Sequence, residues 1–277
     1  MELAGDELGE LPGTGRMPVL FVGHGSPINL VLMNDFTRHL LKLGKEIPKP
    51  KAIMVVSAHW LTDGSYVTCM KKPRTIYDFY GFPDQLYGIS YPSPGAPRYA
   101  RLAANSVKAA KGSCDTGWGL DHASWSILHH MYPKADIPVF EMSLDYSFND
   151  WHPKPMQYHH DLAKELVALR EKGVLIIGSG NIVHNLQLVD FQKIDATPYD
   201  WATEFDEEVR SALLSGSIRE LINYQNLSRK AYLAVPTLDH YLPMIYAVAL
   251  QQQGETLRFT YEGFQNGSIS MRCFRIG

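Results

Sequence analysis

Three apolar, strand-like stretches of the chain each lead to a histidine. They are residues 18–23 before His24, residues 52–57 before His59 and residues 174–178 before His184. Parallel strands of an open α/β sheet end at a common edge, so side chains just beyond those ends converge on one crevice. Neutral imidazole is a common ligand of zinc and iron. The pattern therefore predicts a metal site at the edge of a sheet, with His240 as a further candidate.

Helical and strand-like patterns alternate along most of the chain, which is typical of the α/β class. Helices are predicted near residues 36–44, 97–111, 122–131, 154–172, 201–214 and 239–252, and strands at 18–23, 52–57, 138–144, 174–178, 257–261 and 268–274. We expect one domain with a central, mostly parallel or mixed sheet flanked by helices and the metal site at the carboxyl edge of its strands. The last strand is expected to pair antiparallel at an edge.

Length and composition fit a single globular domain. A chain of 277 residues with 45% hydrophobic content can bury one sizeable core. Residues 1–16 are acidic and contain several glycines, so they are interpreted as a flexible leader before a catalytic domain over 17–277. The net charge of −3 provides no basic field, which argues against nucleic acid or anionic lipid as a partner.

Targeting signals and disulfides are not indicated by the sequence. No stretch approaches the roughly 18 apolar residues that a membrane span requires, and no basic segment precedes an apolar one near the N-terminus. The three cysteines, Cys69, Cys114 and Cys273, are scattered and odd in number, without a Cys-x-x-Cys pair. We therefore expect neither a disulfide framework nor a thiolate zinc site, and a cytoplasmic location.

A long aromatic segment with many glycines and prolines covers residues 72–97. Such a loop in a compact domain is usually functional or flexible, and its aromatic content suits a lid or wall over a flat apolar ligand. The alternative is a loop anchored by its own aromatic cluster.

Five of the eleven histidines lie at the ends of predicted elements, within two residues of Gly, Ser, Asp or Asn: His24, His59, His122, His184 and His240. The other six, at positions 39, 129, 130, 152, 159 and 160, fit surface or packing roles. His-Glu-x-x-His and Gly-x-Ser-x-Gly are both absent from the sequence, which argues against a zincin-type metalloprotease and a serine hydrolase.

Five ordered motifs together resemble one protein family. They are Gly23–Pro27, Ser57–Trp60, Leu120–Trp125, Ser179–Asn185 and Pro236–Pro243. The chain resembles the class III extradiol ring-cleavage dioxygenases, in the DOPA 4,5-dioxygenase branch, from about Met17 to Gly277.

The resemblance implies a ligand set and catalytic roles for the five histidines. His24, His59 and His240 would bind the metal, with His184 as acid/base group or fourth ligand. His122 would contact substrate or dioxygen. Protocatechuate-type members complete their triad with a carboxylate, for which the candidates here are Asp239 and Glu262.

The resemblance also implies the reaction and its cofactor. The cofactor would be one divalent metal ion per chain, with Fe²⁺ required for activity. The purified protein would contain Zn²⁺, because zinc binds nitrogen-rich sites more tightly than Fe²⁺ does. Dioxygen would open a catechol-type, DOPA-like substrate to a muconic semialdehyde. A histidine titrating near neutral pH can take the phenolic proton and later return it, with His184 the first choice and His122 the second. The alternatives are a zinc-dependent hydrolase and a non-catalytic, Memo-like binding protein.

Overall fold

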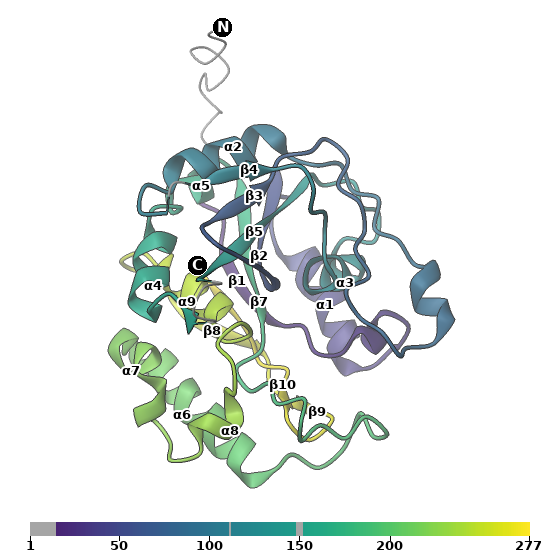
Figure 1. Cartoon of the computed structure of the whole chain (residues 1–277), viewed down its shortest axis with the longest axis vertical. Helices are drawn as coiled ribbons and strands as arrows, with labels where there is room; N and C mark the ends of the chain where they lie inside the picture. The colour runs from purple at the N-terminus through teal and green to yellow at the C-terminus, as the bar shows by residue number, and fades with distance from the viewer. Residues whose placement is uncertain (1–14, 111, 148–151) are drawn as a thin grey trace, which may run out of the picture.

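The computed structural model describes residues 15–110, 112–147 and 152–277 (Figure 1). Within these ranges a nine-stranded sheet has the order β4-β3-β5-β2-β7-β1-β11-β8, and β6 pairs with β5. The strands are β1 Val19–Gly23, β2 Ala52–Thr62, β3 Tyr66–Thr68, β4 Ser113–Asp115, β5 Val139–Ser147, β6 His152–Pro153, β7 Val174–Gly180, β8 Leu257–Tyr261 and β11 Cys273–Ile276. A separate two-stranded sheet pairs β9 Phe264–Gln265 with β10 Ile269–Ser270.

The centre of the large sheet is parallel, as predicted. Strands β5, β2, β7 and β1 pair in parallel, and every residue of β1 and β7 is buried. Burial on both faces explains the continuous apolar runs that identify these strands in the sequence. The final strand, β11, is antiparallel as expected, but it lies inside the sheet because β8 pairs with its outer side. The α/β prediction is confirmed.

Helices cover both faces of the sheet (Figure 1). They are α1 Asp35–Glu46, α2 Pro97–Ser106, α3 His122–Met131, α4 Met156–Lys164, α5 Ala168–Glu171, α6 Asp200–Ser215, α7 Ile218–Ile222, α8 Ala231–Ala234 and α9 Leu242–Ala249, with short 3₁₀ helices η1 Pro27–Leu30, η2 Asp84–Gly88 and η3 Tyr224–Asn226. Helices α1 and α3 pack on one face, and α2, α4 and α9 pack on the other. Among the described residues, no helix combines the length and apolarity that a membrane crossing needs.

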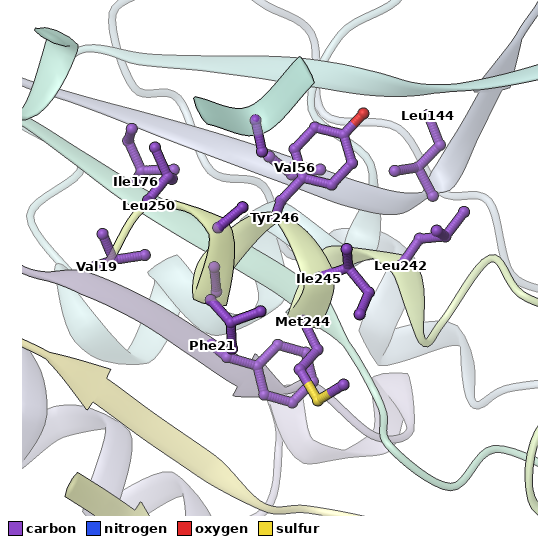
Figure 2. Packing of buried hydrophobic residues seen from close by; sticks show 14 of the residues in the cluster. Val19, Phe21, Val56, Leu144, Ile176, Leu242, Met244, Ile245, Tyr246 and Leu250 are labelled. Carbon is purple, nitrogen blue, oxygen red and sulfur yellow. The ribbon is translucent and has the colours of Figure 1, made fainter. Parts of the chain in front are cut away.

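Helix α9 lies at the centre of one hydrophobic layer. All eight of its residues are buried. Figure 2 shows its Met244, Ile245 and Tyr246 beside Phe21 of β1 and Val56 of β2. Successive strand residues point to opposite faces of a sheet. The neighbours of Phe21 and Val56 along their strands therefore pack in a second hydrophobic layer on the opposite face of the sheet. The two layers leave α9 little freedom to move away from the sheet.

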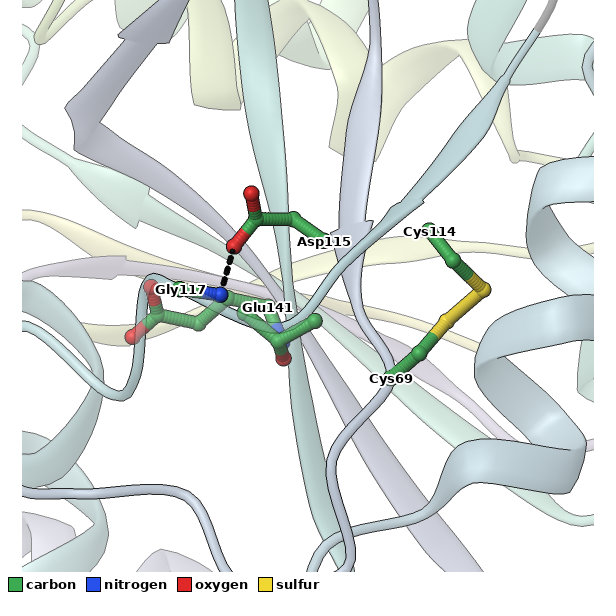
Figure 3. Close-up of a disulfide and its surroundings, with 6 residues drawn as sticks. Cys69, Cys114, Asp115, Gly117 and Glu141 are labelled. Carbon is green, nitrogen blue, oxygen red and sulfur yellow. Dashed lines mark hydrogen bonds between the residues drawn. A yellow bond between two sulfur atoms is a disulfide. The ribbon is translucent and has the colours of Figure 1, made fainter.

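Two cysteines contradict the expectation that the chain has no disulfide. Cys69, just after β3, is bonded to Cys114 of β4, although 45 residues separate them in the sequence (Figure 3). The two strands pair in parallel at the edge of the sheet, and the Cys69 amide donates to the Asp115 carbonyl at 2.8 Å. This pairing brings the two cysteines together, which sequence spacing does not reveal. Cys273 is free and buried.

Two predicted helices are shorter than expected. The helix predicted over 154–172 is two helices, because the amides of Glu165, Leu166 and Val167 bond three residues back instead of four. The apolar spacing continues through this tighter turn, so periodicity does not show it. The helix predicted over 97–111 ends at Ser106. There the Glu165 carboxylate accepts the next amides, those of Lys108 and Ala109.

Several other boundaries also differ from prediction. Helix α9 begins at Leu242 rather than at 239, and the strand predicted over 268–274 is divided between β10 and β11. The predicted leader, 1–16, lies outside the described residues except for Gly15 and Arg16. Arg16 forms an exposed ion pair with Glu171 at 3.2 Å. The division into a leader and a domain over 17–277 stays a prediction.

Candidate metal centre

Five histidines from distant parts of the chain meet in one cluster. The ring centroid of His24 lies 5.2 Å from that of His59, 5.6 Å from that of His122 and 5.3 Å from that of His240. The rings of His184 and His240 are stacked, with centroids 3.5 Å apart. These are the five histidines that the sequence selects by their positions at element ends.

The other described histidines make contacts of a different kind. His39 packs against Tyr261, His130 contacts the carbonyl oxygen of Asn29, and the buried His159 contacts the Tyr246 hydroxyl. His129 packs against His130, and His160 contacts Asp161. These contacts agree with the surface and packing roles expected for them. The side chain of His152 lies outside the described residues.

Parallel pairing of β1 with β7 positions His24. Gly23 is in register with Gly180, and the His24 amide donates to the Gly180 carbonyl at 3.1 Å. His59 is placed differently from expectation, because it lies inside β2 rather than beyond its end. The pairing of β2 with β5 shifts register between Val56 and Leu61, so His59 occupies an irregular part of the strand.

Close backbone contact holds the His240 segment against β7. The amide of Asn181 donates to the His240 carbonyl at 2.9 Å. A Cβ atom on Gly180 would lie 2.2 Å from that carbonyl oxygen, and one on Gly178 would lie 2.1 Å from the Pro243 carbonyl oxygen. Only glycine permits so close an approach. The glycines of β7 therefore make room for the segment that carries His240.

Each of the three expected ligands has its Nδ1 atom occupied by a neighbour. His24 Nδ1 lies 3.1 Å from Ser179 Oγ, which itself donates to the Ala123 carbonyl at 2.6 Å, so the imidazole must be the donor to Ser179. His59 Nδ1 pairs with Asp78 Oδ2 at 2.9 Å. His240 Nδ1 pairs with Asp239. Such contacts fix the tautomer that leaves Nε2 bare for a metal.

The Nε2 atoms of His24 and His59 are spaced as ligands of one ion. His24 Nε2 and His59 Nε2 are 3.3 Å apart, and two nitrogens bound to a tetrahedral zinc ion lie roughly 3.4 Å apart. His240 Nε2 is buried and has no hydrogen-bond partner among the described residues. Ligand atoms of His24, His59 and His122 also lie within 4.8 Å of one another. The donor set therefore fits a divalent metal ion.

Burial keeps most of the cluster uncharged. It lowers the pKa of His24 well below its ordinary value, and neighbouring histidines lower it further. Burial and His59 lower the pKa of His122 to about 4, against the opposing effect of Asp78. Burial and His240 lower the pKa of His184. Neutral imidazole is the form that binds metal.

The carboxylates beside the cluster carry charge that a cation would balance. Burial favours a raised pKa for Asp78, but hydrogen bonds from His122 and His59 outweigh it and hold this pKa well below its ordinary value. In Asp239, the electrostatic interaction and hydrogen bond with His240 likewise outweigh burial and lower the pKa. Among the described residues, neither carboxylate pairs with a lysine or arginine.

Both candidate carboxylate ligands have other partners. Asp239 contacts Nδ1 of His240, so it acts behind that imidazole. Glu262 pairs with Arg272 and, at 3.3 Å, with Arg210. These contacts favour His240 over a carboxylate as the third ligand.

The segment over 72–97 is anchored by its own aromatic cluster. Phe79 packs against Phe82, Tyr87 and Trp125, and its ring meets the His122 ring edge-on at 5.5 Å. The interpretation as a loop anchored by its own aromatic cluster is confirmed, and a lid or wall over a ligand stays a prediction.

Sequence reasoning missed Asp78 and assigned no role to Ser179. Asp78 is one of two carboxylates within the aromatic segment, and nothing in the sequence distinguishes it from Asp84. Asp121, which precedes His122 in the sequence, accepts from Ser57 Oγ at 2.7 Å. Burial and the nearby Asp78 raise its pKa to about 6.

Comparison with known proteins identifies the family. Residues 30–268 match the family model described as the catalytic LigB subunit of aromatic ring-opening dioxygenase. The chain belongs to this family. It is an oxidoreductase, an extradiol dioxygenase that opens an aromatic ring with O₂ and a metal and acts on a small molecule.

Relatives and a solved structure agree with this assignment. The dioxygenase is 42% identical over 95% of both chains to a protein of Escherichia coli K12 named 4,5-DOPA dioxygenase extradiol. It is 36% identical to a protein of the same name from Mirabilis jalapa, over 82% of this chain and 84% of the relative. The crystal structure of an uncharacterized Escherichia coli K12 protein matches with TM-score 0.80 and 39% identity, over 95% of this chain and all of the other.

Proposed function

We propose that the dioxygenase inserts O₂ into a catechol-type, DOPA-like substrate beside its hydroxyl groups and yields a muconic semialdehyde. The names of the Escherichia coli and Mirabilis jalapa relatives support this substrate class. The observation that carries the proposal is the histidine cluster, in which a neighbour holds Nδ1 of each expected ligand. The family match favours this function over a zinc hydrolase or a Memo-like binding protein.

In this proposal His24, His59 and His240 hold the metal ion. A divalent ion there, Fe²⁺ in the active enzyme, would supply the redox chemistry that activates O₂ and would bind the catechol oxygens. Zinc would occupy the same nitrogen donors without supporting oxidation. Ser179, Asp78 and Asp239 keep the three imidazoles in the tautomer that exposes Nε2.

His184 is proposed as the group that moves the proton, or as a fourth ligand. Its ring stacks on that of His240, and its backbone amide donates to the Ala234 carbonyl at 2.9 Å. Burial and His240 hold the pKa of His184 well below the near-neutral value expected from the sequence, so its imidazole is neutral at pH 7 and can accept the proton of a substrate hydroxyl and return it during ring opening. His122 would contact substrate or O₂, with the Phe79 ring beside it as an apolar wall.

Oxygen uptake tests this function. Protein stripped of metal and reloaded anaerobically with Fe²⁺ or Zn²⁺ would receive DOPA, protocatechuate or simple catechols, while oxygen and absorbance are followed. We expect uptake and a yellow product only in the iron form, with both lost in His184→Ala. Failure of the iron form to consume oxygen with every catechol would contradict the proposal.

A cytoplasmic location stays a prediction. The Cys69–Cys114 disulfide is the feature that stands against it, because disulfides are rare in a reducing cytosol. Labelling of free thiols in protein taken directly from cells would show which state the two cysteines occupy.

A further inference from the structure

One carboxylate contacts two histidines of the cluster at once. Asp78 Oδ2 lies 2.9 Å from His59 Nδ1 and 2.9 Å from His122 Nδ1. The other oxygen, Oδ1, accepts the backbone amide of His122 at 2.8 Å. An ionised carboxylate only accepts hydrogen bonds, and each oxygen has room for two donors. Neither short contact has the angles of a hydrogen bond, but an acceptor-only carboxylate this close to two Nδ1 atoms favours a proton on Nδ1 of both imidazoles.

We propose that Asp78 is a positioning residue that fixes the tautomer and ring orientation of His59 and His122 together. The inference rests on the proposed function, in which His59 is a metal ligand and His122 contacts substrate or O₂. With both Nδ1 atoms facing one oxygen, the ring centroids are held 4.1 Å apart. The bare Nε2 atoms are then available to the metal and to the substrate side of the site.

The segment that carries Asp78 is itself firmly held. The amide of Ile76 donates to the Leu120 carbonyl at 2.7 Å, and the Leu120 amide donates to the Arg74 carbonyl at 2.8 Å. The indole of Trp125 donates to the Ile76 carbonyl at 2.9 Å. These bonds join the strand-like part of the segment to the residues just before α3, which begins with His122. The carboxylate and the helix that it serves therefore move as one unit.

Two further carboxylates, Glu141 and Asp121, bond to groups around the same helix start. Glu141 accepts the amide of Asp121 at 2.7 Å and the indole N–H of Trp118 at 3.0 Å. Asp121 accepts from Ser57, whose hydroxyl also accepts the His59 amide at 3.1 Å. They shape the backbone around His59 and His122, whereas Asp78 acts on the rings.

Replacement of Asp78 by Asn keeps the size of the side chain but places an amide N–H group against two imidazole donors. One histidine must then turn or change tautomer. We expect Asp78→Asn to weaken metal binding by roughly 10- to 100-fold. Binding would be measured with Zn²⁺ against a chromophoric chelator, and the visible spectrum of the Co²⁺-loaded protein should change. Asp84→Asn, the same substitution on an exposed residue of the same segment, should alter neither.

Proton NMR of the metal-free protein provides a readout that does not depend on activity. Wild type should show low-field Nδ1 protons from His59, His122 and His240, the last of which faces Asp239. Asp78→Asn should shift the first two and leave that of His240 in place. Asp78→Glu, which retains a carboxylate, should recover part of the metal affinity if the asparagine variant folds poorly.

Wild-type metal affinity in Asp78→Asn, or a shift of the His59 proton alone, would overturn the inference. The two proposals fail separately. If no catechol is oxidised but the protons of both His59 and His122 shift, the substrate assignment fails and the positioning role of Asp78 stands.

Discussion

Substitution of Gly180 by alanine should disrupt the contact that brings His240 to the sheet. The added Cβ would lie 2.2 Å from the His240 carbonyl oxygen, where ordinary contact begins at 3.4 Å. The two segments would have to separate by about 1 Å, because a backbone carbonyl cannot rotate away as a flexible side chain can. Helix α9, which follows His240 directly, is buried along its whole length and cannot yield freely.

Overpacking of this kind typically costs about 1–3 kcal/mol, and the backbone contact places Gly180→Ala near the upper end. Urea unfolding of the metal-free protein would measure this loss. The same shift moves His240, so zinc affinity should fall roughly tenfold or more. Gly88 is the matched control, because a Cβ there meets nothing within 4 Å. An unfolding midpoint for Gly180→Ala equal to those of wild type and Gly88→Ala would refute this reasoning.

Three further outcomes follow from other contacts. Burial favours a higher pKa for Glu255, but its hydrogen bonds from Arg170 hold the pKa below its ordinary value. This stabilisation is present above the unfolded-state pKa of Glu255 and is lost as pH falls through its folded-state pKa. The free energy of unfolding, measured with urea, should therefore fall less steeply at acid pH in Glu255→Gln than in wild type. Reduction of Cys69–Cys114 should lower stability by about 2–4 kcal/mol, as calorimetry with and without reductant would show, because the bond closes a long loop. His240→Ala should lose bound zinc by metal analysis, and full retention would remove it from the ligand set.

Local patterns predict much of the scaffold. The apolar runs that become β1, β2 and β7 are buried on both faces, and continuous burial is what a continuous apolar run encodes. The histidines near the ends of these runs are predicted to lie close together, because parallel strands share one carboxyl edge. The structure brings these histidines together.

Contacts between distant segments are not encoded in such patterns. Asp78 serves His59 and His122 from a loop whose aromatic residues indicate only a packed wall. Cys69 and Cys114 meet because two short edge strands pair in parallel, which neither their number nor their spacing indicates. Both relations depend on which segments become neighbours in space.

Sequence patterns alone indicate the α/β class, the edge of the sheet where the histidine cluster forms and the five histidines that gather there. These properties follow from hydrophobic periodicity and from residues at the ends of elements, which are local. The tertiary structure decided the position of His59 within β2, the carboxylate behind each ring and the close approach of His240 to Gly180. Those features arise from side-chain hydrogen bonds and backbone packing between segments far apart in the chain, which only the folded arrangement specifies.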